Sequence, residues 1–434
     1  MSAPAHGRTD EMVAERFDVV VVGGGPAGVA AAVAAGREGL RTALVEWHGY
    51  FGGSRTAAAV DTFYGFWTPG GEARPVVGGI GLEIVEATLG RGGFRRENTY
   101  GAGPGVTYDV HDLKLVLDDL VLGAGVRPVL HTSVSGVRRD GDDWEVTLVT
   151  PTCGPWSVRA GTVVDTTGDA TAAALAGLPV VLPGEQGPVQ SLTSIFFLGG
   201  VDVDAALAVS HEERSELTRQ ADESGSYRLP RHEGSLHRTP RPGMLQANIV
   251  RVADVDVTDP AALTAAEIEG RRQVVEYLRF FRDRLPGFAD AYVAEIAPQI
   301  GIRESRRIRG VTTLTESDVL DGVRDDQAIA LAAAPIEDHR ACSDTRWAPV
   351  GGDGLYSIPF QALVPTTGEG FLAAGRCLSA EHAAQASARN SAQAFATGEA
   401  AGYATALAVR SGVALRAIDV QELRARIRGN GGLV

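Results

Sequence analysis

The segment from Phe17 to Glu46 constrains the fold more than any other part of the chain. A β-branched run, Phe17–Val22, is followed by the glycine-rich turn Gly-Gly-Gly-Pro-Ala-Gly, an alanine-rich stretch and a second apolar run that ends at Glu46. A glycine motif alone is weak evidence, but here the strand, the helix, the second strand and the terminal acid all follow in order. This pattern predicts a βαβ unit whose helix N-terminus binds the pyrophosphate of a dinucleotide.

Each glycine of this unit has an expected physical role. Gly23 allows the tight turn, Gly25 lets the backbone approach the pyrophosphate, and Gly28 lets the helix pack closely on the strand. Glu46 is expected to accept hydrogen bonds from the ribose hydroxyl groups. The predicted binding residues of the unit are Gly23, Gly25, Pro26, Ala27, Gly28 and Glu46.

The composition excludes several classes of function. The formal charge of −14 argues against nucleic-acid binding, because a polyanion would be repelled. Cys153, Cys342 and Cys377 lie far apart without a CxxC pair, which excludes a dithiol redox centre and a cysteine-based metal site, so we expect no metal. Lys114 is the single lysine among 40 basic residues, so nearly every cationic site must be an arginine. The polar N-terminal stretch and the odd cysteine count favour a cytoplasmic protein without a membrane segment.

The remaining chain predicts an α/β fold with an inserted domain. Helices are expected at 82–89, 109–122, 170–176, 204–223, 261–284 and 380–406, and strands at 129–137, 144–149, 156–164, 194–198, 246–250 and 371–375. We assign 15–65, 106–185 and 336–434 to a discontinuous Rossmann-like domain that combines a parallel sheet with an antiparallel meander. Residues 66–105 and 186–335 are expected to form a mixed α+β substrate domain, and residues 1–14 a flexible N-terminus.

A second glycine-punctuated strand and helix, from Phe371 to Gly402, indicates which dinucleotide binds. A nicotinamide dehydrogenase usually places its nucleotide fold in one contiguous block, whereas this pair lies near the other end of the chain. In two-domain FAD enzymes the C-terminal helix returns to the nucleotide domain, and its N-terminus points at the flavin pyrimidine, where the dipole stabilises negative charge. The pattern therefore favours FAD, with a plain small-residue packing helix as the alternative.

The order of several motifs resembles a known family. These motifs are Gly-Gly-Gly-Pro-Ala-Gly at 23–28, Glu46, Gly52-Gly53, Thr167-Gly-Asp169, Ile302-Arg-Glu-Ser-Arg-Arg-Ile308, Asp338-His339, Ile358-Pro359 and Ala374-Gly-Arg-Cys-Leu-Ser379. Together they resemble the FAD-dependent oxidoreductase family, within the wider glutathione-reductase-like flavoproteins, over nearly the whole chain. The resemblance implies FAD, a Rossmann-like domain and a mixed substrate domain, but no particular substrate. The cofactor-binding residues added to those of the first unit are Gly53, Ser54, Arg55, Val134, Thr167, Gly168, Asp169, Gly375, Arg376, Ala384, Ser387 and Gly398.

Motifs that the chain lacks narrow the reaction. No second GxGxxG lies inside a βαβ unit, so a built-in NAD(P)H domain is not expected. Thr167-Gly-Asp169 matches the Asp-Gly motif of aromatic-ring monooxygenases poorly, and Lys114 is the sole lysine that could activate oxygen. The remaining interpretation is two-electron dehydrogenation of a small polar metabolite, with hydride transfer to flavin N5 and electrons passed to oxygen or another external acceptor. A flavin monooxygenase, a reductase of an activated C=C or C=N bond and a non-catalytic FAD-binding protein are the alternatives.

Such a reaction needs a base for the acidic proton and an anchor for the substrate. His339 and His382 are the candidate bases, because histidine titrates near neutral pH and the resemblance places both near the flavin; a structural role is the alternative for each. Tyr356 is a further acid/base candidate. Arg303 and Arg376 are the candidate catalytic anchors, because a guanidinium pairs with a carboxylate through two hydrogen bonds. The substrate is therefore expected to carry a carboxylate.

Other features have ordinary structural explanations beside functional ones. Four arginines lie within residues 301–310, and such a charge run is more often an ion-paired or solvated face than a substrate contact. Arg389 is a further anchor candidate, a covalent flavin link at His48 stays open, and a homodimer is compatible with the sequence. The residues expected in the core or around the flavin are Phe63, Tyr64, Phe66 and Trp67, and those expected at the surface or in loops are His111, His131, His211, His232 and His237.

Overall fold

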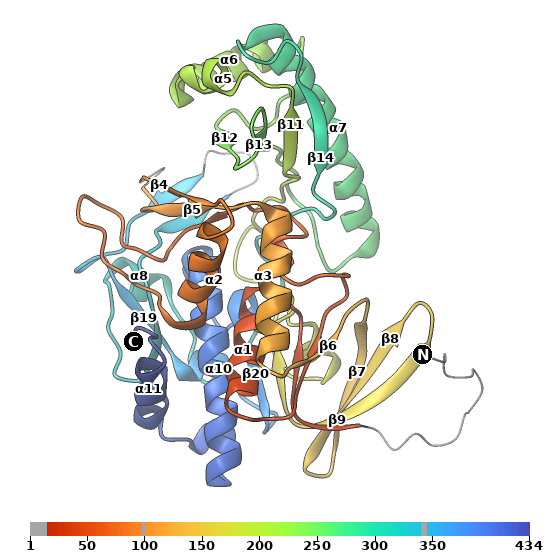
Figure 1. The fold of residues 1–434 in the computed structure, drawn as a ribbon, viewed down its shortest axis with the longest axis vertical. Coiled ribbons are helices and arrows are strands. Elements are labelled where there is room, and N and C mark those ends of the chain that lie inside the picture. The colour runs from red at the N-terminus through yellow and green to blue at the C-terminus, as the bar shows by residue number, and fades with distance from the viewer. Residues whose placement is uncertain (1–14, 98–100, 340–344) are drawn as a thin grey trace.

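The computed structural model describes residues 15–97, 101–339 and 345–434. The expected flexibility of residues 1–14 and the surroundings of Cys342 therefore fall outside the described residues. The chain forms two parts that lie one above the other in Figure 1. The larger, lower part is built around a parallel-rich sheet, and the smaller, upper part around an antiparallel sheet.

A seven-stranded sheet organises the lower part, with the order β6–β2–β1–β9–β8–β7 and with β20 also paired to β9. β6, β2, β1, β9 and β20 form parallel pairs, whereas β9, β8 and β7 form an antiparallel meander. The strands are β1 (Arg16–Val22), β2 (Thr42–Val45), β6 (Arg127–Val129), β7 (Ser133–Asp140), β8 (Asp143–Thr150), β9 (Gly154–Asp165) and β20 (Phe371–Ala373). This architecture confirms the predicted α/β class with a Rossmann-like sheet and a meander.

β1 is buried on both faces, as its continuous β-branched run predicts. Val19 and Val21 point into a core that they share with residues of α1 and α10, whereas Val20 and Val22 pack on the other face with residues of the meander. The two helices are α1 (Pro26–Arg37) and α10 (Ser391–Ser411). The sheet thus has a helical layer on one side and the meander with α4 (Thr171–Leu175) on the other.

The lower part also contains segments that we expected in the substrate domain. Helix α2 (Gly79–Leu89) lies beside α1 and α10 in Figure 1, and its buried side chains belong to their hydrophobic core. Leu314, Val319 and apolar residues between 329 and 333 join the same core. The buried apolar side chains of these segments therefore pack with the nucleotide-binding part, and the expected division into domains stays a prediction.

The upper part is built on a four-stranded antiparallel sheet with the order β12–β13–β11–β14. Its strands are β11 (Phe196–Gly199), β12 (Ser235–Arg238), β13 (Leu245–Asn248) and β14 (Tyr292–Ile296), and its helices are α5 (Val203–Ala208), α6 (His211–Glu223) and α7 (Pro260–Arg284). α7 lies along the sheet in Figure 1, and its Val274, Tyr277 and Phe281 share a core with Phe196 and Leu245. This second core belongs to the inserted α+β part that the sequence predicts.

Three elements that we expected to be continuous are interrupted. The expected helix 204–223 is α5 and α6, because the side chain of Ser210 accepts a backbone hydrogen bond and caps a new helix. The expected helix 380–406 is α9 and α10, because Asn390 has an extended backbone and begins the second helix. The expected strand 129–137 is β6 and β7, which pair with different neighbours.

The remaining elements are short. They are β3 (Thr62–Phe63), β4 (Phe94–Arg96), β5 (Gly105–Thr107), β10 (Val180–Val181), β15 (Arg307–Ile308), β16 (Ala328–Ala332), β17 (Ile336–Asp338), β18 (Arg346–Ala348), β19 (Tyr356–Pro359), α3 (Val110–Gly123), α8 (Glu316–Leu320), α9 (His382–Ala388), α11 (Val420–Gly429), and the 3-10 turns η1 (Gly53–Arg55), η2 (Phe360–Leu363), η3 (Gly375–Cys377) and η4 (Leu415–Ala417). Within the described ranges, no helix combines the length and the apolar character that a bilayer crossing needs.

Burial answers two predictions about side chains, the surface position of His237 and the role of Phe63 and Phe66. His237, expected at the surface, is buried on β12, with 7% of its surface exposed. Phe63 and Phe66 pack with Phe395 in the main core, so they have the packing role rather than lining an open cavity.

Candidate functional site

The glycine-rich turn between β1 and α1 has the geometry that its sequence predicts. Gly23 has a φ of +103°, and a Cβ there would lie 2.6 Å from the carbonyl oxygen of Thr166. A Cβ at Gly28 would lie 1.7 Å from the carbonyl oxygen of Gly23. Both positions therefore exclude every side chain, the first because of the left-handed turn and the second because α1 packs directly on the strand.

The space in front of this turn fits a pyrophosphate. A Cβ at Gly25 would meet nothing closer than the Cα of Gly53, at 3.8 Å. Gly25 is also the N-cap of α1 and provides no side-chain acceptor for the first backbone N–H groups. Since Pro26 and Ala27 open the helix, its unpaired N–H groups and its dipole face a cradle between Gly25 and η1. Anionic phosphate oxygens are the groups that such a cradle accepts.

Glu46 at the end of β2 is held by the chain itself. Its Oε2 accepts a hydrogen bond from the N–H of Gly24 at 2.7 Å, and its Oε1 accepts from the N–H of His48 at 2.8 Å. The Nδ1 of His48 lies 3.1 Å from the same Oε1. A carboxylate can accept about four hydrogen bonds, so capacity for a ribose hydroxyl is left on Oε2. Val134, a further predicted contact, is half-buried on β7 and paired with Leu148.

The loops after β9 and β20 meet through an ion pair. The Nη2 of Arg376 donates to Oδ1 of Asp169 at 2.8 Å, and the guanidinium lies over Gly168, where a Cβ would be 2.8 Å from Nη2. The side chain of Thr167 donates to the buried carboxylate of Asp165 at 2.7 Å. Nη1 of Arg376 is buried without a partner within the described residues. This orphaned donor faces no protein acceptor, which is what a site for an anionic or polar ligand group requires.

The N-terminus of α10 is the second buried helix end of the lower part. Asn390 caps it without a side-chain hydrogen bond, and the first-turn residues Ser391, Ala392 and Gln393 are buried. Oγ of Ser391 and Oε1 of Gln393 have no hydrogen-bond partner in the part of the chain that the structure describes. A buried helix end of this kind stabilises negative charge in a bound group. Together with the cradle at Gly25 and the orphaned Arg376, these residues fit FAD.

Three residues predicted to contact the cofactor have packing or hydrogen-bond partners within the protein. The hydroxyl of Ser387 donates to the carbonyl oxygen of Ala334 at 2.5 Å and pairs with the hydroxyl of Tyr356 at 2.7 Å. Ala384 is completely buried on α9. A Cβ at Gly398 would lie 2.1 Å from the carbonyl oxygen of Ala27, so this glycine permits the close approach of α1 and α10. Packing and hydrogen bonds within the protein account for these three residues, and their contact with the cofactor stays a prediction.

The candidate base His382 is a cation in a balanced bridge. Its Nδ1 lies 2.9 Å from Oε2 of Glu304 and its Nε2 lies 3.0 Å from Oδ1 of Asp338. Although burial opposes the charge, hydrogen bonds to the two carboxylates raise the pKa of His382 to about 9. Glu304 also pairs with the fully buried Arg307 at 2.6 Å. Both imidazole nitrogens have carboxylate partners within the protein, and the role of His382 as a proton acceptor stays a prediction.

The other two acid/base candidates are also engaged within the protein. Nε2 of His339 lies 2.8 Å from Oε1 of Glu337, and its Nδ1 lies 3.0 Å from Oγ1 of Thr345. Burial and the nearby Arg303 guanidinium hold the pKa of His339 well below its usual range. Burial raises the pKa of Tyr356, whose hydroxyl is paired with Ser387. These contacts give both side chains positioning roles and leave neither with a free nitrogen or oxygen for a substrate.

Arg303 lies in a cluster of buried guanidinium groups between the two parts of the molecule. We define the arginine cluster as Arg231, Arg303, Arg389 and the carboxylate of Glu337. Burial lowers the pKa of Arg303 well below its usual range, and the charges of Arg231 and Arg389 lower it further, whereas Glu337 opposes them. The Nη1 of Arg303 donates to the carbonyl oxygen of Ser191 at 2.6 Å, and Nη2 of Arg389 donates to the backbone of Glu337 at 3.0 Å. The carboxylate of Glu337 lies 4.0 Å from Arg389. Burial opposes its charge, but the hydrogen bond with His339 and the charges of Arg389 and Arg303 lower the pKa of Glu337 to about 2.

Sequence reasoning missed Arg231, which comes from the upper part just before β12. It lies beside Glu233, which also pairs with Arg251 at 2.9 Å. No sequence motif marks Arg231, and it lies far from the arginine run of residues 301–310 in the sequence. It joins Arg303 and Arg389 because the upper part folds down onto the loop before β15.

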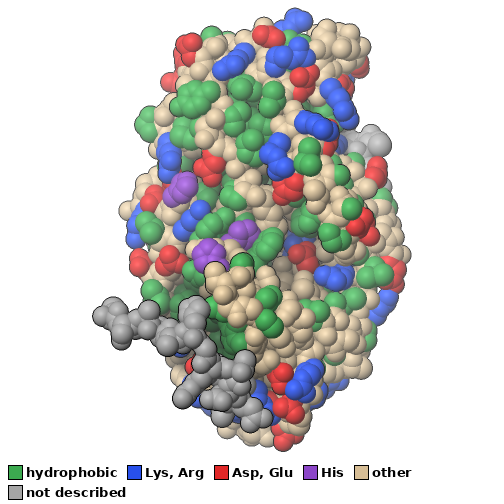
Figure 2. Space-filling view, turned by 90° about the vertical axis from the view of Figure 1, so that its right-hand side faces the viewer, with side chains coloured by type: hydrophobic (Ala, Val, Ile, Leu, Met, Phe, Trp, Pro, Cys, Tyr) green, Lys and Arg blue, Asp and Glu red, His purple; other side chains and the backbone are tan. Residues whose placement is uncertain are grey.

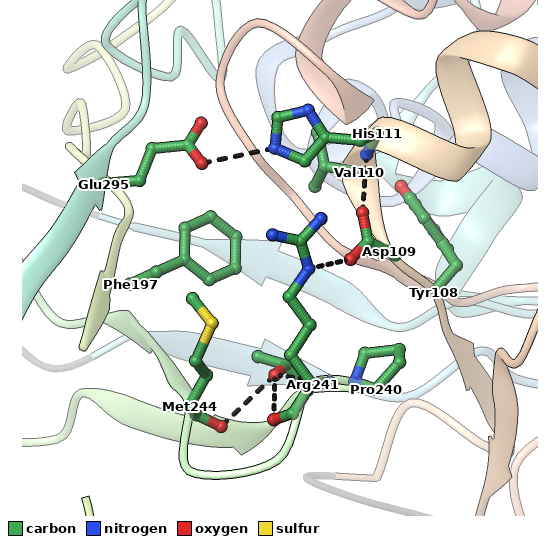
Figure 3. A pocket seen from close by; sticks show the side chains of 10 residues that line it. Tyr108, Asp109, Val110, His111, Phe197, Pro240, Arg241, Met244 and Glu295 are labelled. Atoms are coloured by element: carbon green, nitrogen blue, oxygen red, sulfur yellow. Dashed lines mark hydrogen bonds and ion pairs between the residues drawn. The ribbon is translucent and has the colours of Figure 1, made fainter. Parts of the chain in front are cut away.

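A small pocket of about 20 Å³ lies between α3 and the upper sheet. Figure 3 shows Asp109 and His111 at the N-terminus of α3 facing Arg241 and Glu295 across it. Asp109 is paired with Arg241, and Nε2 of His111 lies 3.4 Å from Oε2 of Glu295. None of the residues predicted as catalytic or cofactor-binding lines this pocket.

The face shown in Figure 2 carries positive and negative side chains in a mixed arrangement, with histidines near its middle. No extended surface of one sign is visible on this face. Long tracts of positive charge are the usual footprint of nucleic-acid binding, and this face does not show one.

Comparisons with known proteins identify the family of this chain. Residues 18–427 match the family described as FAD-dependent oxidoreductase. A geranylgeranyl bacteriochlorophyll reductase-like protein from Thermoplasma acidophilum has a similar fold, with a TM-score of 0.50 and 16% identity over 96% of this chain and 84% of that chain. A p-nitrophenol 4-monooxygenase from Pseudomonas putida aligns with a TM-score of 0.45 and 14% identity over 92% of this chain and 82% of that chain. No curated protein sequence matches. The protein belongs to the FAD-dependent oxidoreductase family, and its cofactor is FAD.

Proposed function

We propose that the enzyme dehydrogenates a small metabolite that carries a carboxylate, and that it belongs among the glutathione-reductase-like flavoproteins. The observation that supports this proposal is the arginine cluster. Within the described residues, Glu337 lies 4.0 Å from Arg389, and its charge opposes the lowering of the pKa of Arg231, Arg303 and Arg389. An anion bound among them would restore the charge balance.

The energetic reason is the cost of burying like charges. A buried charge is stable only when it is paired and hydrogen-bonded. Burial lowers the pKa of Arg231, Arg303 and Arg389, and Nε of Arg389 is buried without a hydrogen-bond partner in the described part of the chain. A carboxylate accepts two parallel N–H groups from one guanidinium, which satisfies donors and charge at once.

Other residues of the chain would bind the cofactor and orient the substrate. Gly25 and the N-terminus of α1 would hold the pyrophosphate of FAD, Glu46 the ribose, and the N-terminus of α10 the flavin pyrimidine. FAD supplies an acceptor for a hydride from the substrate C–H. The arginine cluster would orient the carboxylate end, and the upper part would exclude water from the reacting carbon. Oxygen or another external acceptor would then take up the electrons.

Anaerobic stopped-flow spectroscopy of the yellow holoenzyme tests this function. We would screen 2-hydroxy and 2-amino acids against the corresponding amides, and record the loss of flavin absorbance. The proposal expects bleaching by an acid and none by its amide. Bleaching by neutral compounds only would overturn the carboxylate assignment. Oxygen-dependent hydroxylation with consumption of an external nicotinamide would favour the monooxygenase alternative.

A further inference from the structure

A second group of unsatisfied polar atoms lies around Asp61, at the junction of the two parts. Oδ1 of Asp61 accepts hydrogen bonds from Oγ1 of Thr62 and from Nε2 of Gln246, both at 3.0 Å. Oδ2 of Asp61 and Oε1 of Gln246 are buried and have no partner within the described ranges. Nε of Arg55 is likewise buried and unpartnered there, while its Nη1 donates to the backbone of Thr62 at 2.7 Å. Only 2% of the surface of Asp61 is exposed.

The position of this group connects it to the flavin site. The segment that carries it begins at Gly53, which lies against the cradle at Gly25, and continues through Arg55 to Asp61. The charge of Arg55 is felt by Arg389 of the arginine cluster and by Asp61. Arg55 therefore acts electrostatically on both groups, and its Nη1 donates a hydrogen bond to the backbone of Thr62.

The same group also adjoins the pocket drawn in Figure 3. The N–H of Tyr108 donates to the carbonyl oxygen of Asp61 at 3.0 Å, and Tyr108 lines that pocket. On the other side, Gln246 on β13 bridges Asp61 to the upper sheet and also donates to the carbonyl oxygen of Ala59 at 3.0 Å. The backbone of Asp61 thus contacts a residue that lines the pocket, and its carboxylate contacts the upper sheet through Gln246.

Among the described titratable groups around Asp61, only Asp61 has a pKa near neutral pH. Burial raises the pKa of Asp61 to about 7, although the cations Arg55 and Arg96 lower it. Burial raises the pKa of Tyr108, so its hydroxyl stays neutral. Burial and Arg96 lower the pKa of His237 to about 3, so this imidazole is also neutral. The carboxylate of Asp61 therefore has an oxygen, Oδ2, that is unpaired within the described residues, near the permanent positive charges of Arg55 and Arg96.

We propose that Asp61 is the proton acceptor of the reaction, with Gln246 and Arg55 as the groups that position the substrate beside it. This inference rests on the proposed dehydrogenation. The O–H or N–H of the substrate would give its proton to Oδ2 of Asp61, and bound FAD would supply the two-electron acceptor for the hydride from the adjacent C–H bond. A C=O or C=N bond forms, so the substrate loses two electrons and two hydrogens. Asp61 ends protonated and returns its proton to water before the next turnover.

The chain offers a matched control for Asp61. Glu399 on α10 is also buried, with 2% of its surface exposed, and burial raises its pKa to about 7. Its Oε2 accepts a hydrogen bond from the N–H of Ile80 at 3.0 Å, at the start of α2. Asp61→Asn and Glu399→Gln each remove one buried carboxylate with a similar pKa, but only the first lies at the proposed site.

The first measurement is the binding of malonate to oxidised holoenzyme, followed by the change in flavin absorbance between pH 6 and pH 8. Ionisation of Asp61 beside the bound anion should weaken malonate binding about three- to tenfold across this range. Asp61→Asn should remove this pH dependence, and Glu399→Gln should keep it. Equal pH dependence in wild type and Asp61→Asn overturns the inference, because a carboxylate that only ties the two parts together would not sense the ligand.

The second measurement does not depend on a carboxylate ligand. The midpoint potential of the bound flavin is recorded against pH, and its slope should change near the pKa of Asp61 in wild type and in Glu399→Gln but not in Asp61→Asn. A slope that is unaffected by Asp61→Asn overturns the inference. If malonate fails to bind at any pH while the potential responds as expected, the carboxylate assignment fails and the role of Asp61 stands. If Asp61→Asn does not retain FAD, Asp61→Glu supplies the comparison, because it keeps the carboxylate and should keep the change of slope.

Discussion

Arg303 and Glu304 are neighbours in sequence, but their side chains enter two buried polar regions of opposite character. Glu304 joins a balanced network, in which two cations, Arg307 and His382, meet two carboxylates, its own and that of Asp338. Arg303 joins the arginine cluster, in which positive charge exceeds negative charge within the described residues. A buried network with equal numbers of positive and negative groups stabilises the fold. An excess of buried positive charge is costly, and binding an anionic ligand lowers that cost. The difference suggests that charge balance, rather than burial or residue type, separates structural ions from binding ions in this enzyme.

The largest expected effect comes from unbalancing the first region. Glu304→Gln leaves the buried guanidinium of Arg307 without its anionic partner and should lower the free energy of unfolding by about 3–5 kcal/mol. Chemical denaturation of the holoenzyme measures this change. Glu316→Gln is the control, because Glu316 pairs with Arg346 at the half-exposed surface and should have little effect. If the two variants are equally stable, the network around Glu304 is not the balanced structural centre that we infer.

An intermediate loss of folding stability is expected when the pH rises and His382 loses its proton. Because its folded-state pKa is about 9 and its ordinary value is 6.5, the folded state binds the proton more tightly. The stabilisation is therefore fully present below pH 6.5, and it is lost as the pH rises towards 9. The loss should be on the order of 3 kcal/mol for a shift of this size.

The melting temperature between pH 6 and pH 9 tests this prediction. His382→Gln should lose most of this pH dependence, whereas His111→Gln, which changes a half-exposed histidine, should keep it. A pH dependence that survives in His382→Gln would show that another group titrates in this range and that the bridge is not the cation we describe.

A substitution in the arginine cluster should have the smallest effect on the free energy of unfolding. It should, however, clearly weaken ligand binding. Arg303→Lys keeps the charge but loses the planar pair of N–H groups, so it should weaken malonate binding about tenfold or more while the unfolding free energy changes little. Flavin difference spectra measure the binding. Arg309→Lys is the control, because Arg309 lies in the same segment but pairs with Glu185 at the surface. Equal malonate affinity in both variants would contradict a ligand role for the arginine cluster.

Local pattern determined much of this protein. The run from Phe17 to Glu46 predicts the strand, the turn and the helix, because the positive φ of Gly23 and the close contact of Gly28 with the carbonyl oxygen of Gly23 are local constraints. The alternation of residues 133–165 likewise predicts the meander. The class of fold and the identity of the cofactor therefore followed from the sequence.

The tertiary structure decided which side chains can react. His382 and Tyr356 look like bases in sequence, but partners from distant segments contact their polar atoms, whereas the partners of His339 are near it in sequence. Arg231 and Asp61 carry no motif, and their importance depends on which charges the upper part brings against the lower part. Protonation and charge balance are set by the sum of burial and neighbouring charges in space, and no local pattern of residues contains that sum.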